Sequence, residues 1–521
     1  MLNFAQPYPS QRSPVCAENV VATSQPLAAQ AGLNAMRRGG NAVDAALAAA
    51  ITLTVVEPNN NGVGSDAFAI LWTGDELVGL NASGRSPEGW SPQRFRGAKE
   101  MPSHGWDSVT VPGAVSAWVA LSERYGALAF DELFEDAVRY AREGFQVGPI
   151  SARYWQNAVQ QFADYEGFQR HFAPAPDQGA RFVREDLAAT LEEIATTHGE
   201  SFYRGRLAAA IADTARAQGG VMTQADLESH QADWVQPIEQ AYRHVALHEI
   251  PPNGQGLAAQ IALGILQHLP ATELDSADAL HLEIEAMKIA IRASFDHFAD
   301  PAAMRLAPEA LLGAGSLEAA AASIGAQAAD LPPKALPIGQ DTVYLTTADA
   351  EGRMVSFIQS NFAGFGSGVV IPDTGIAMQN RGSGFTLDPA HPNCVGPRKR
   401  PFHTIIPGFV TEAGAPKLAF GVMGGHMQHQ GHVQMVRRIF DHHQNPQAAS
   451  DAPRWHVYPD FSVGLEPGIA PEIHEALQAR GHRVREERRP WIFGGAQLIY
   501  RSADGYIAGS DHRKEGGAVG F

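Results

Sequence analysis

The chain has little cysteine and no long apolar run. Its 521 residues include two cysteines, Cys16 and Cys394, which are too few and too far apart for a disulfide framework or a zinc-ligand pattern. No segment runs about 18 apolar residues without a break, and the first residues lack a basic stretch followed by an apolar one. We therefore expect a soluble, cytoplasmic protein with no membrane partner.

Positive charge is also scarce. Lys and Arg number 39 against 56 Asp and Glu, which gives a formal net charge of −17. Such a chain repels the phosphate backbone of nucleic acids and anionic lipid headgroups, so neither is expected as a partner. The length leaves room for two domains or for one large layered α/β structure.

A self-cleavage site is indicated by the segment Gly339-Gln340-Asp341-Thr342-Val343-Tyr344. Alternating residues at 343–347, a turn at 349–352 and an apolar run at 354–358 predict that Thr342 begins a β-hairpin. A threonine that starts a chain carries both a hydroxyl nucleophile and an α-amine that can deprotonate it. That amine has a pKa of about 7.7–8.0, whereas an uncut amide nitrogen has no basicity, so the uncut protein should be inactive. Taken alone, the Asp-Thr pair would fit an ordinary strand-edge threonine.

The pattern along the chain separates helices from strands. A segment rich in Ala, Gly and Pro at about 300–338 predicts an exposed stretch before the cut. Segregated helices and strands favour stacked sheets covered by helices over an alternating parallel fold. Two helices are expected within 23–53, separated at Gly39-Gly40, and further helices at 114–125, over most of 130–297, and at 430–440 and 471–479. Strands are expected in a hairpin at 68–79 and at 343–345, 354–358, 375–378, 405–410, 417–422 and 496–500.

Several short motifs occur in the order found in one family. They are Gly39-Gly40-Asn41-Ala42-Val43-Asp44-Ala45-Ala46, Gly62-Val63-Gly64-Ser65-Asp66-Ala67-Phe68, Gly84-Arg85-Ser86-Pro87, Val111-Pro112-Gly113, Asp341-Thr342, Gly396-Pro397-Arg398-Lys399-Arg400-Pro401 and Gly424-Gly425. With these motifs the chain resembles the γ-glutamyltranspeptidases, N-terminal nucleophile hydrolases that are made as proenzymes and cut themselves. The resemblance implies an α+β fold, a four-layer αββα sandwich. It also implies an α/β heterodimer from one chain, with residues 1–341 as the large subunit and 342–521 as the small one; whether heterodimers pair stays open.

The resemblance assigns catalytic roles to matched positions. Thr342 matches the nucleophile, and the bond between Asp341 and Thr342 matches the cleavage site. Ser360 matches a family threonine that contacts the nucleophile. Gly424 and Gly425 match the oxyanion-hole pair, whose backbone N–H groups face the charge that develops in the transition state. This machinery implies no cofactor and no metal.

The substrate-binding positions partly depart from the family. Arg85 matches the arginine that holds the substrate's α-carboxylate, although a surface salt bridge is its alternative role. Where the family has acidic and amide side chains for the α-amino group of glutamate, this chain has Arg381 and Gly384. An ammonium facing Arg381 would be repelled, whereas a second anionic group would be attracted.

Four further positions complete the expected substrate site. Phe362 replaces a family asparagine, and His403-Thr404 replaces the usual serine pair near the carboxylate. His426 directly follows the oxyanion glycines, which indicates a place facing the substrate or just behind it.

A small amide that carries a carboxylate and no α-amine would satisfy these residues. Oxamate amidohydrolases are a branch of this superfamily with such a substrate, which they hydrolyse to ammonia and oxalate in purine-nitrogen catabolism, with water as the acyl acceptor. The alternatives are a γ-glutamyltransferase or glutathione hydrolase, a cephalosporin-acylase-like amidase, and a non-catalytic binding protein. The presence of Thr342, Arg85 and the glycine pair together argues against the last.

Three other patterns have weaker interpretations. His426, His429 and His432 have a spacing that can put imidazoles on one helix face, which would suit a metal, but no acidic or cysteine ligand accompanies them at usual spacing. The glycines near residue 62 lack the lysine of a phosphate-binding loop. The basic run at 398–400 is expected to be a solvated loop or an anchor for a substrate lid.

Overall fold

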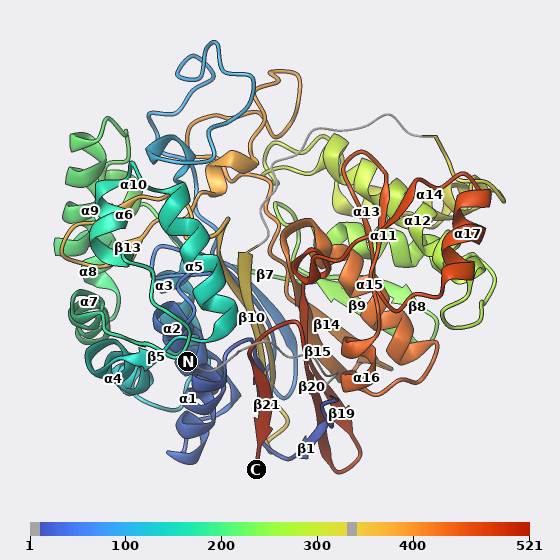
Figure 1. The fold of residues 1–521 in the computed structure, drawn as a ribbon, viewed down its shortest axis with the longest axis horizontal. Helices are drawn as coiled ribbons and strands as arrows, with labels where there is room; N and C mark the ends of the chain where they lie inside the picture. Colours follow the sequence, from blue (N-terminus) through green and yellow to red (C-terminus); the bar gives the residue numbers. More distant parts are fainter. Residues whose placement is uncertain (1–10, 331–340) are drawn as a thin grey trace.

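Two seven-stranded antiparallel sheets form the centre of the computed structural model, which describes residues 11–330 and 341–521 (Figure 1). The first sheet contains, in spatial order, β21 (Gly517–Gly520), β2 (Val20–Thr23), β10 (Asp341–Ala348), β11 (Met354–Phe362), β3 (Asp66–Trp72), β4 (Leu77–Asn81) and β7 (Asp233–Val235). The second contains β1 (Val15–Ala17), β20 (Gly505–Ser510), β19 (Gly495–Ser502), β15 (Ala415–Met423), β14 (Gly408–Glu412), β9 (Val245–Glu249) and β8 (Ile238–Tyr242).

Helices cover the outer face of each sheet (Figure 1). On the side of the first sheet lie α1 (Pro26–Arg37), α2 (Ala42–Val56), α3 (Ala114–Tyr125), α4 (Glu135–Glu143), α5 (Pro149–Gln161), α6 (Glu166–Phe172), α7 (Glu185–Thr196), α8 (Glu200–Arg204), α9 (Arg206–Ala217) and α10 (Gln224–Glu228). On the side of the second lie α11 (Gly256–Gln267), α12 (Ala277–His297), α13 (Pro308–Leu311), α14 (Ala314–Ala322), α15 (Gln428–Phe440), α16 (Pro446–Asp451) and α17 (Pro471–Ala479). The result is the predicted four-layer αββα sandwich.

Short elements complete the chain. The short strands are β5 (Phe145–Gln146), β6 (Arg181–Phe182), β12 (Val370–Ile371), β13 (Ile376–Ala377), β16 (Trp455–Val457), β17 (Val463–Leu465) and β18 (Val484–Glu486). The 3-10 turns are η1 (Trp106–Ser108), η2 (Phe130–Phe134), η3 (Arg381–Gly384), η4 (Gly425–Met427) and η5 (Pro490–Phe493). Two of these turns, η3 and η4, carry residues of the candidate site.

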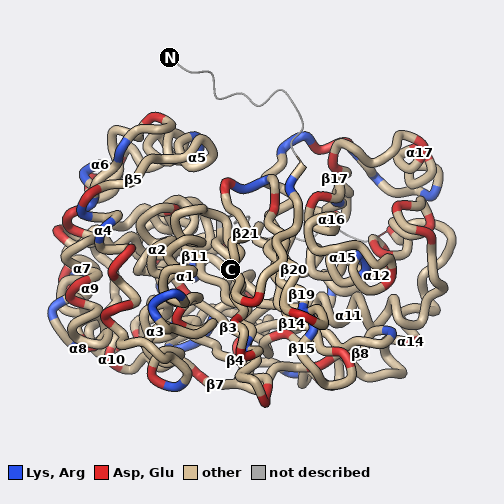
Figure 2. Tube along the Cα trace, turned by 90° about the horizontal axis from the view of Figure 1, so that it is seen from below, with Lys and Arg blue, Asp and Glu red and all other residues tan. Residues whose placement is uncertain are grey.

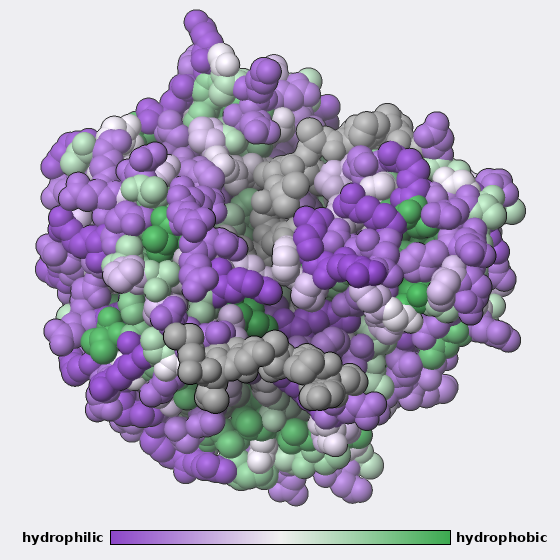
Figure 3. Space-filling model, viewed as in Figure 1, coloured by the Kyte–Doolittle hydropathy of each residue, from purple (hydrophilic) through white to green (hydrophobic). Residues whose placement is uncertain are grey.

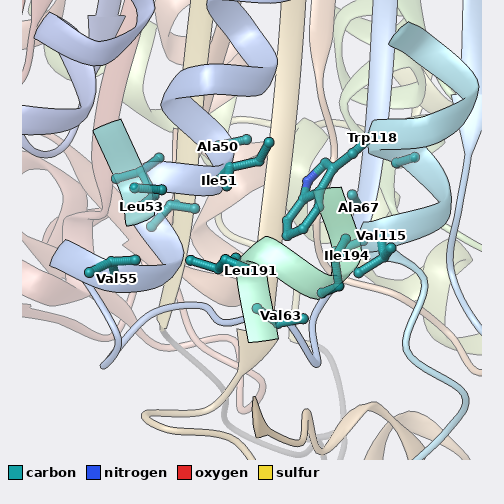
Figure 4. Close-up of a cluster of buried hydrophobic side chains, with 14 of the residues drawn as sticks. Ala50, Ile51, Leu53, Val55, Val63, Ala67, Val115, Trp118, Leu191 and Ile194 are labelled. Carbon is teal, nitrogen blue, oxygen red and sulfur yellow. The ribbon is translucent and has the colours of Figure 1, made fainter. Parts of the chain in front are cut away.

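Helix α2 shows why these residues form a central helix. The Asn41 side chain accepts from the N–H groups of Val43 and Asp44, and the Asp44 carboxylate accepts from the Asn41 N–H, which closes a capping box. All 15 residues of α2 are buried, and its many alanines let it approach its neighbours closely. Its Ile51 and Leu53 belong to the same apolar cluster as Trp118 of α3 and Leu191 of α7 (Figure 4).

A separate apolar cluster lies between the two sheets. It includes Phe68, Tyr344, Ile358, Phe409 and Ala419, which come from strands of both sheets. Since side chains alternate along a strand, the neighbours of these residues point to the outer helices instead. By the same alternation, the side chains of Thr342, Asp66 and Ser360 also point into the space between the sheets.

The charged residues are scattered over the outer segments of both halves (Figure 2). The face drawn in Figure 3 is mostly hydrophilic, with small separate hydrophobic areas. Among the described residues, every helix is too short or too polar to span a bilayer. The segment at about 300–338, expected to be an exposed stretch, contains α13 and α14, and its residues from 331 on lie outside the described part of the chain.

Candidate active site

The predicted nucleophile, Thr342, lies at the irregular start of a central strand. In β10 the pairing with β11 shifts register between Asp341 and Val343, so Thr342 sits at a bulge. Its side chain is buried, and its Oγ1 donates to Ser360 Oγ at 3.2 Å. Ser360 Oγ also accepts from the Phe362 N–H at 2.8 Å. The structure thus brings together the two hydroxyls that the sequence paired.

Alternation along the strands puts three polar side chains on the face between the sheets. Thr342 stands two residues before Tyr344, and Ser360 stands two residues after Ile358, both of which belong to the inter-sheet cluster. Asp66 is the direct cross-strand partner of Ser360 on β3. All three therefore point toward the second sheet, at the end where β10 begins.

The two glycines predicted for the oxyanion hole follow β15 in that second sheet. Across the sheets Thr346 Oγ1 donates to the Ala419 carbonyl at 3.4 Å, and a β-carbon at Gly421 would lie 2.4 Å from the Tyr344 ring. Thr346 thus faces Ala419, and Tyr344 faces Gly421. Two residues further along each strand, Thr342 comes close to Met423, at the end of β15. Gly424 and Gly425 have φ of +117° and +56°, a region that favours glycine.

Near the predicted nucleophile lies a small cavity with a volume of about 10 Å³. Phe362, one of its walls, is the Cα partner of Asp341 in the β10–β11 pairing, so the cavity borders the predicted cleavage site. The lining residues are Phe362, Arg381, Gly384, Phe402, Thr404 and His426. The sequence named all of these positions except Phe402, whose ring stacks on His426.

Arg381 is the charged group of this cavity. It is 2% exposed, its Nη1 donates to Thr404 Oγ1 at 2.8 Å, and its guanidinium carbon lies 4.9 Å from the centre of the Phe362 ring. Its Nε and Nη2 have no hydrogen-bond partner among the described residues. Burial lowers the pKa of Arg381 to about 9, against the opposing effect of Asp66, so the side chain remains a cation at neutral pH.

His403 and Asp66 form a buried pair behind the cavity. His403 Nε2 lies 3.1 Å from Asp66 Oδ2, and both side chains are fully buried. Asp66 Oδ1 also accepts from the N–H groups of Gly84 and Gly113. Burial raises the pKa of Asp66 to about 7 and, helped by nearby arginines, lowers that of His403 well below its usual value. His403 is thus absent from the cavity lining, and sequence reasoning assigned Asp66 no role.

Arg85 takes a different position from the one expected of a substrate anchor. Its side chain is 44% exposed and forms an ion pair with Asp300 at 2.9 Å, and it is absent from the cavity lining. The basic run nearby is anchored in the same way, since Arg398 pairs with Glu88 and Arg400 with Asp233. Within the described residues, this geometry matches the salt-bridge alternative for Arg85.

The three histidines do not converge. His426 lines the cavity, His429 Nδ1 lies 2.9 Å from Gln255 Oε1, and His432 Nδ1 lies 2.6 Å from Glu249 Oε1. No group of three or more His, Cys, Asp or Glu in the described part of the chain could hold a metal ion.

Gln255 is a further residue that the sequence did not reveal. Its Nε2 donates to the carbonyls of Thr404 and Gly425, at 2.6 Å and 2.9 Å. One side chain thus joins the cavity wall to the predicted oxyanion loop. The only signal was a polar, glycine-spaced loop, Asn253-Gly254-Gln255-Gly256, between apolar segments.

Comparison with known proteins identifies the family. The model of the family described as gamma-glutamyltranspeptidase matches residues 28–521. The chain belongs to the γ-glutamyltranspeptidase family. It is 34% identical to the glutathione hydrolase-like YwrD proenzyme of Bacillus subtilis, over 98% of this chain and 100% of that one. It is 33% identical to the oxamate amidohydrolase proenzyme of Klebsiella pneumoniae, over 95% and 97%.

A solved structure of the family agrees over the whole chain. Cephalosporin acylase from Bacillus halodurans superimposes with a TM-score of 0.96 at 45% identity, covering 100% of this chain and 99% of that one. The αββα sandwich and the membership in a family of self-processing hydrolases are therefore established. The names of these relatives point to different substrates. The substrate of this chain therefore has to be inferred from the residues of its own cavity.

Proposed function

We propose that the protein is a self-processing amidohydrolase that uses Thr342 to hydrolyse a small carboxylate-bearing amide of the oxamate type. In processing, Thr342 Oγ attacks the carbonyl carbon of Asp341, and the peptide bond becomes an ester as the nitrogen gains a proton. Water then hydrolyses the ester, leaving the Asp341 carboxylate and a free Thr342 amine. The bulge at this point and the burial of Thr342 support the proposal.

Turnover repeats the same attack on a substrate. The Thr342 amine accepts the hydroxyl proton while Oγ bonds to the amide carbon, and the N–H groups of Gly424 and Gly425 face the oxyanion. The proton passes to the amide nitrogen, ammonia leaves, and an acyl ester remains on Oγ. Water hydrolyses that ester and releases the dicarboxylate, while Ser360 holds the nucleophile through the 3.2 Å contact.

The unpartnered fork of Arg381 carries the substrate assignment. Nε and Nη2 are adjacent donors that suit a bidentate carboxylate, and a buried cation without a partner is costly. No acidic side chain occurs among the described lining residues, so an α-ammonium would have no partner. The cavity is small, which favours a small substrate over a bulky one.

A cephalosporin-acylase-like amidase is the second candidate, favoured by the overall match to the Bacillus halodurans acylase. The small cavity disfavours its bulky acyl donors. A glutathione hydrolase is disfavoured by the missing ammonium partner, although one relative carries a glutathione hydrolase-like name.

The test combines processing and substrate choice. Intact mass spectrometry should show wild type and Thr342→Ser cut between Asp341 and Thr342, and Thr342→Ala as one chain. A panel of oxamate, glutamine, glutathione, γ-glutamyl-p-nitroanilide and cephalosporin side-chain amides is then assayed with the mature enzyme. We expect kcat/KM for oxamate to exceed that for glutathione by about a hundredfold, because an unpaired ammonium costs several kcal/mol. A higher kcat/KM for glutathione than for every amine-free amide would overturn the substrate assignment.

A further inference from the structure

Behind the anion-binding cavity lies a second buried charge, of opposite sign to Arg381. Asp66 is fully buried, and its Oδ2 lies 3.1 Å from His403 Nε2. Its other oxygen, Oδ1, accepts from two backbone N–H groups, 3.2 Å away at Gly84 and 3.0 Å away at Gly113. Asp66 therefore has hydrogen-bond partners on both carboxylate oxygens, while the fork of Arg381 on the cavity side has none among the described residues.

Asp66 and a bound carboxylate would interact with the same guanidinium. Burial raises the pKa of Asp66 to about 7, and the field of Arg381 is the largest influence that opposes this rise. A carboxylate on Nε and Nη2 would cancel much of that field and would add its own repulsion. The ionised form of Asp66 is then less favoured with the anion bound than without it.

Other groups face this pair from several elements. Arg381 of η3 and Arg400, which pairs with Asp233 at 2.6 Å, both favour the ionised carboxylate of Asp66. From α8, Tyr203 donates to the Pro112 carbonyl beside Gly113, and burial raises its phenol pKa, which keeps it neutral. His426 lines the cavity itself. The Thr342 amine formed on processing would also lie near a bound anion.

We propose that Asp66, in its buried pair with His403, takes up a proton from solvent when a carboxylate binds Arg381, and so sets the pH range over which the site accepts its substrate. This inference rests on the proposed function, in which Arg381 holds the substrate carboxylate. By linkage, a site that gains a proton on binding binds more weakly as pH rises. Affinity for the anion should fall by up to about tenfold per pH unit above neutrality, until the bound form also loses the proton.

Calorimetry with oxalate, the expected hydrolysis product, tests this on the mature enzyme. Titrations between pH 6 and 8, in buffers of different ionisation enthalpy, report the protons exchanged per oxalate bound. We expect wild type to take up about half a proton at pH 7, where Asp66 is already half-protonated, and closer to one proton at pH 8. Asp66→Asn keeps an oxygen for Gly84 and Gly113 but cannot ionise, so it should lose the uptake and bind oxalate with little pH dependence. Asp233→Asn, half-exposed beside Arg400, is the matched control and should keep the uptake.

Infrared difference spectra supply a measurement that needs no variant. On ¹³C-labelled wild type, oxalate binding should produce the carbonyl band of a protonated protein carboxyl group, which neither His426 nor the Thr342 amine can give. Oxalate binding without proton uptake or without this band overturns the inference and leaves the proposed function intact, as does uptake that persists in Asp66→Asn. Absence of oxalate and oxamate binding at every pH overturns both proposals.

Discussion

Arg85 and Arg381 show that a residue's identity and sequence context can indicate a binding role in one case and mislead in another. The sequence favoured Arg85 as the carboxylate anchor because it matches a family position, and the structure pairs it with Asp300, 215 residues away. Such a distant partner leaves no local pattern. Arg381 was singled out because it replaces an ammonium-binding side chain, and it is the one that lines the cavity.

A matched pair of substitutions separates the two arginines. Arg381→Lys keeps the charge but loses the bidentate fork, so we expect KM for oxamate to rise by roughly 10- to 150-fold, from about 1.5–3 kcal/mol for a charge-assisted hydrogen bond. Arg85→Lys should change KM by less than about threefold, since an exposed ion pair contributes little. Steady-state kinetics on both variants provides the measurement. The reverse ranking would make Arg85 the anchor and remove Arg381 from substrate binding.

Gly384 shows why the substrate site cannot simply be converted to the family type. A β-carbon at this position would lie 2.5 Å from the Phe402 carbonyl oxygen, closer than atoms of real side chains approach. Any side chain here, an aspartate included, requires the backbone of the cavity wall to move. The position of the Phe402 carbonyl therefore disfavours an acidic side chain at residue 384. This steric constraint could not be read from the sequence.

At the scale of elements, the sequence predicted long periodic segments well. The helix expected at 114–125 is α3, the hairpin expected at 68–79 is β3 and β4, and the helix expected at 471–479 is α17. The segment expected to be mostly helical also contains β8 and β9, which form an edge of the second sheet. Half-buried and exposed residues alternate along β8. It pairs with β9, which in turn pairs with β14, more than 150 residues further along the chain. A strand that depends on such distant pairing is hard to recognise locally.

A buried ionic cluster of Asp511, Arg454 and Arg513 should contribute strongly to the stability of the folded protein. Asp511, directly after β20, binds Arg454 at 2.5 Å and Arg513 at 3.1 Å, and accepts from the Ala496 N–H at 2.7 Å. Burial alone would raise the pKa of Asp511, but the two arginines hold it well below its usual range. Asp511→Asn should therefore lower the free energy of unfolding by about 3–5 kcal/mol, because buried Arg454 is left uncompensated.

Urea denaturation checks this value, with Asp213→Asn as the control. Asp213 forms an exposed pair with Arg216 three residues away and should change stability by less than about 1 kcal/mol. Because the folded-state pKa of Asp511 is below the unfolded one, its contribution is complete above about pH 4 and is lost as pH falls further. The difference between wild type and Asp511→Asn should shrink in acid. A constant difference from pH 7 to pH 3 would contradict the assignment.

At the scale of the whole molecule, the proposed cut falls inside one sandwich rather than between two bodies. In the first sheet β2, from the proposed large subunit, lies between β21 and β10 of the small one. In the second sheet β1 and β9 of the large subunit flank the small-subunit strands β20, β19, β15 and β14. Each segment therefore supplies strands to sheets that the other segment also builds, as the colours in Figure 1 show.

This interleaving predicts that the two products stay together after cleavage. Separating them would expose the apolar faces of both sheets and the backbone groups of β10, which pairs with β2 through residues 345–348. Native mass spectrometry of mature protein should show one particle near 55.7 kDa or a multiple of it, and denaturing gels should show two bands. Uncut Thr342→Ala is the control and should give the same native mass with one band. Recovery of a folded, monomeric small subunit from the mature protein without denaturant would contradict this arrangement, because β10 and β21 would then have to be stable without β2 between them.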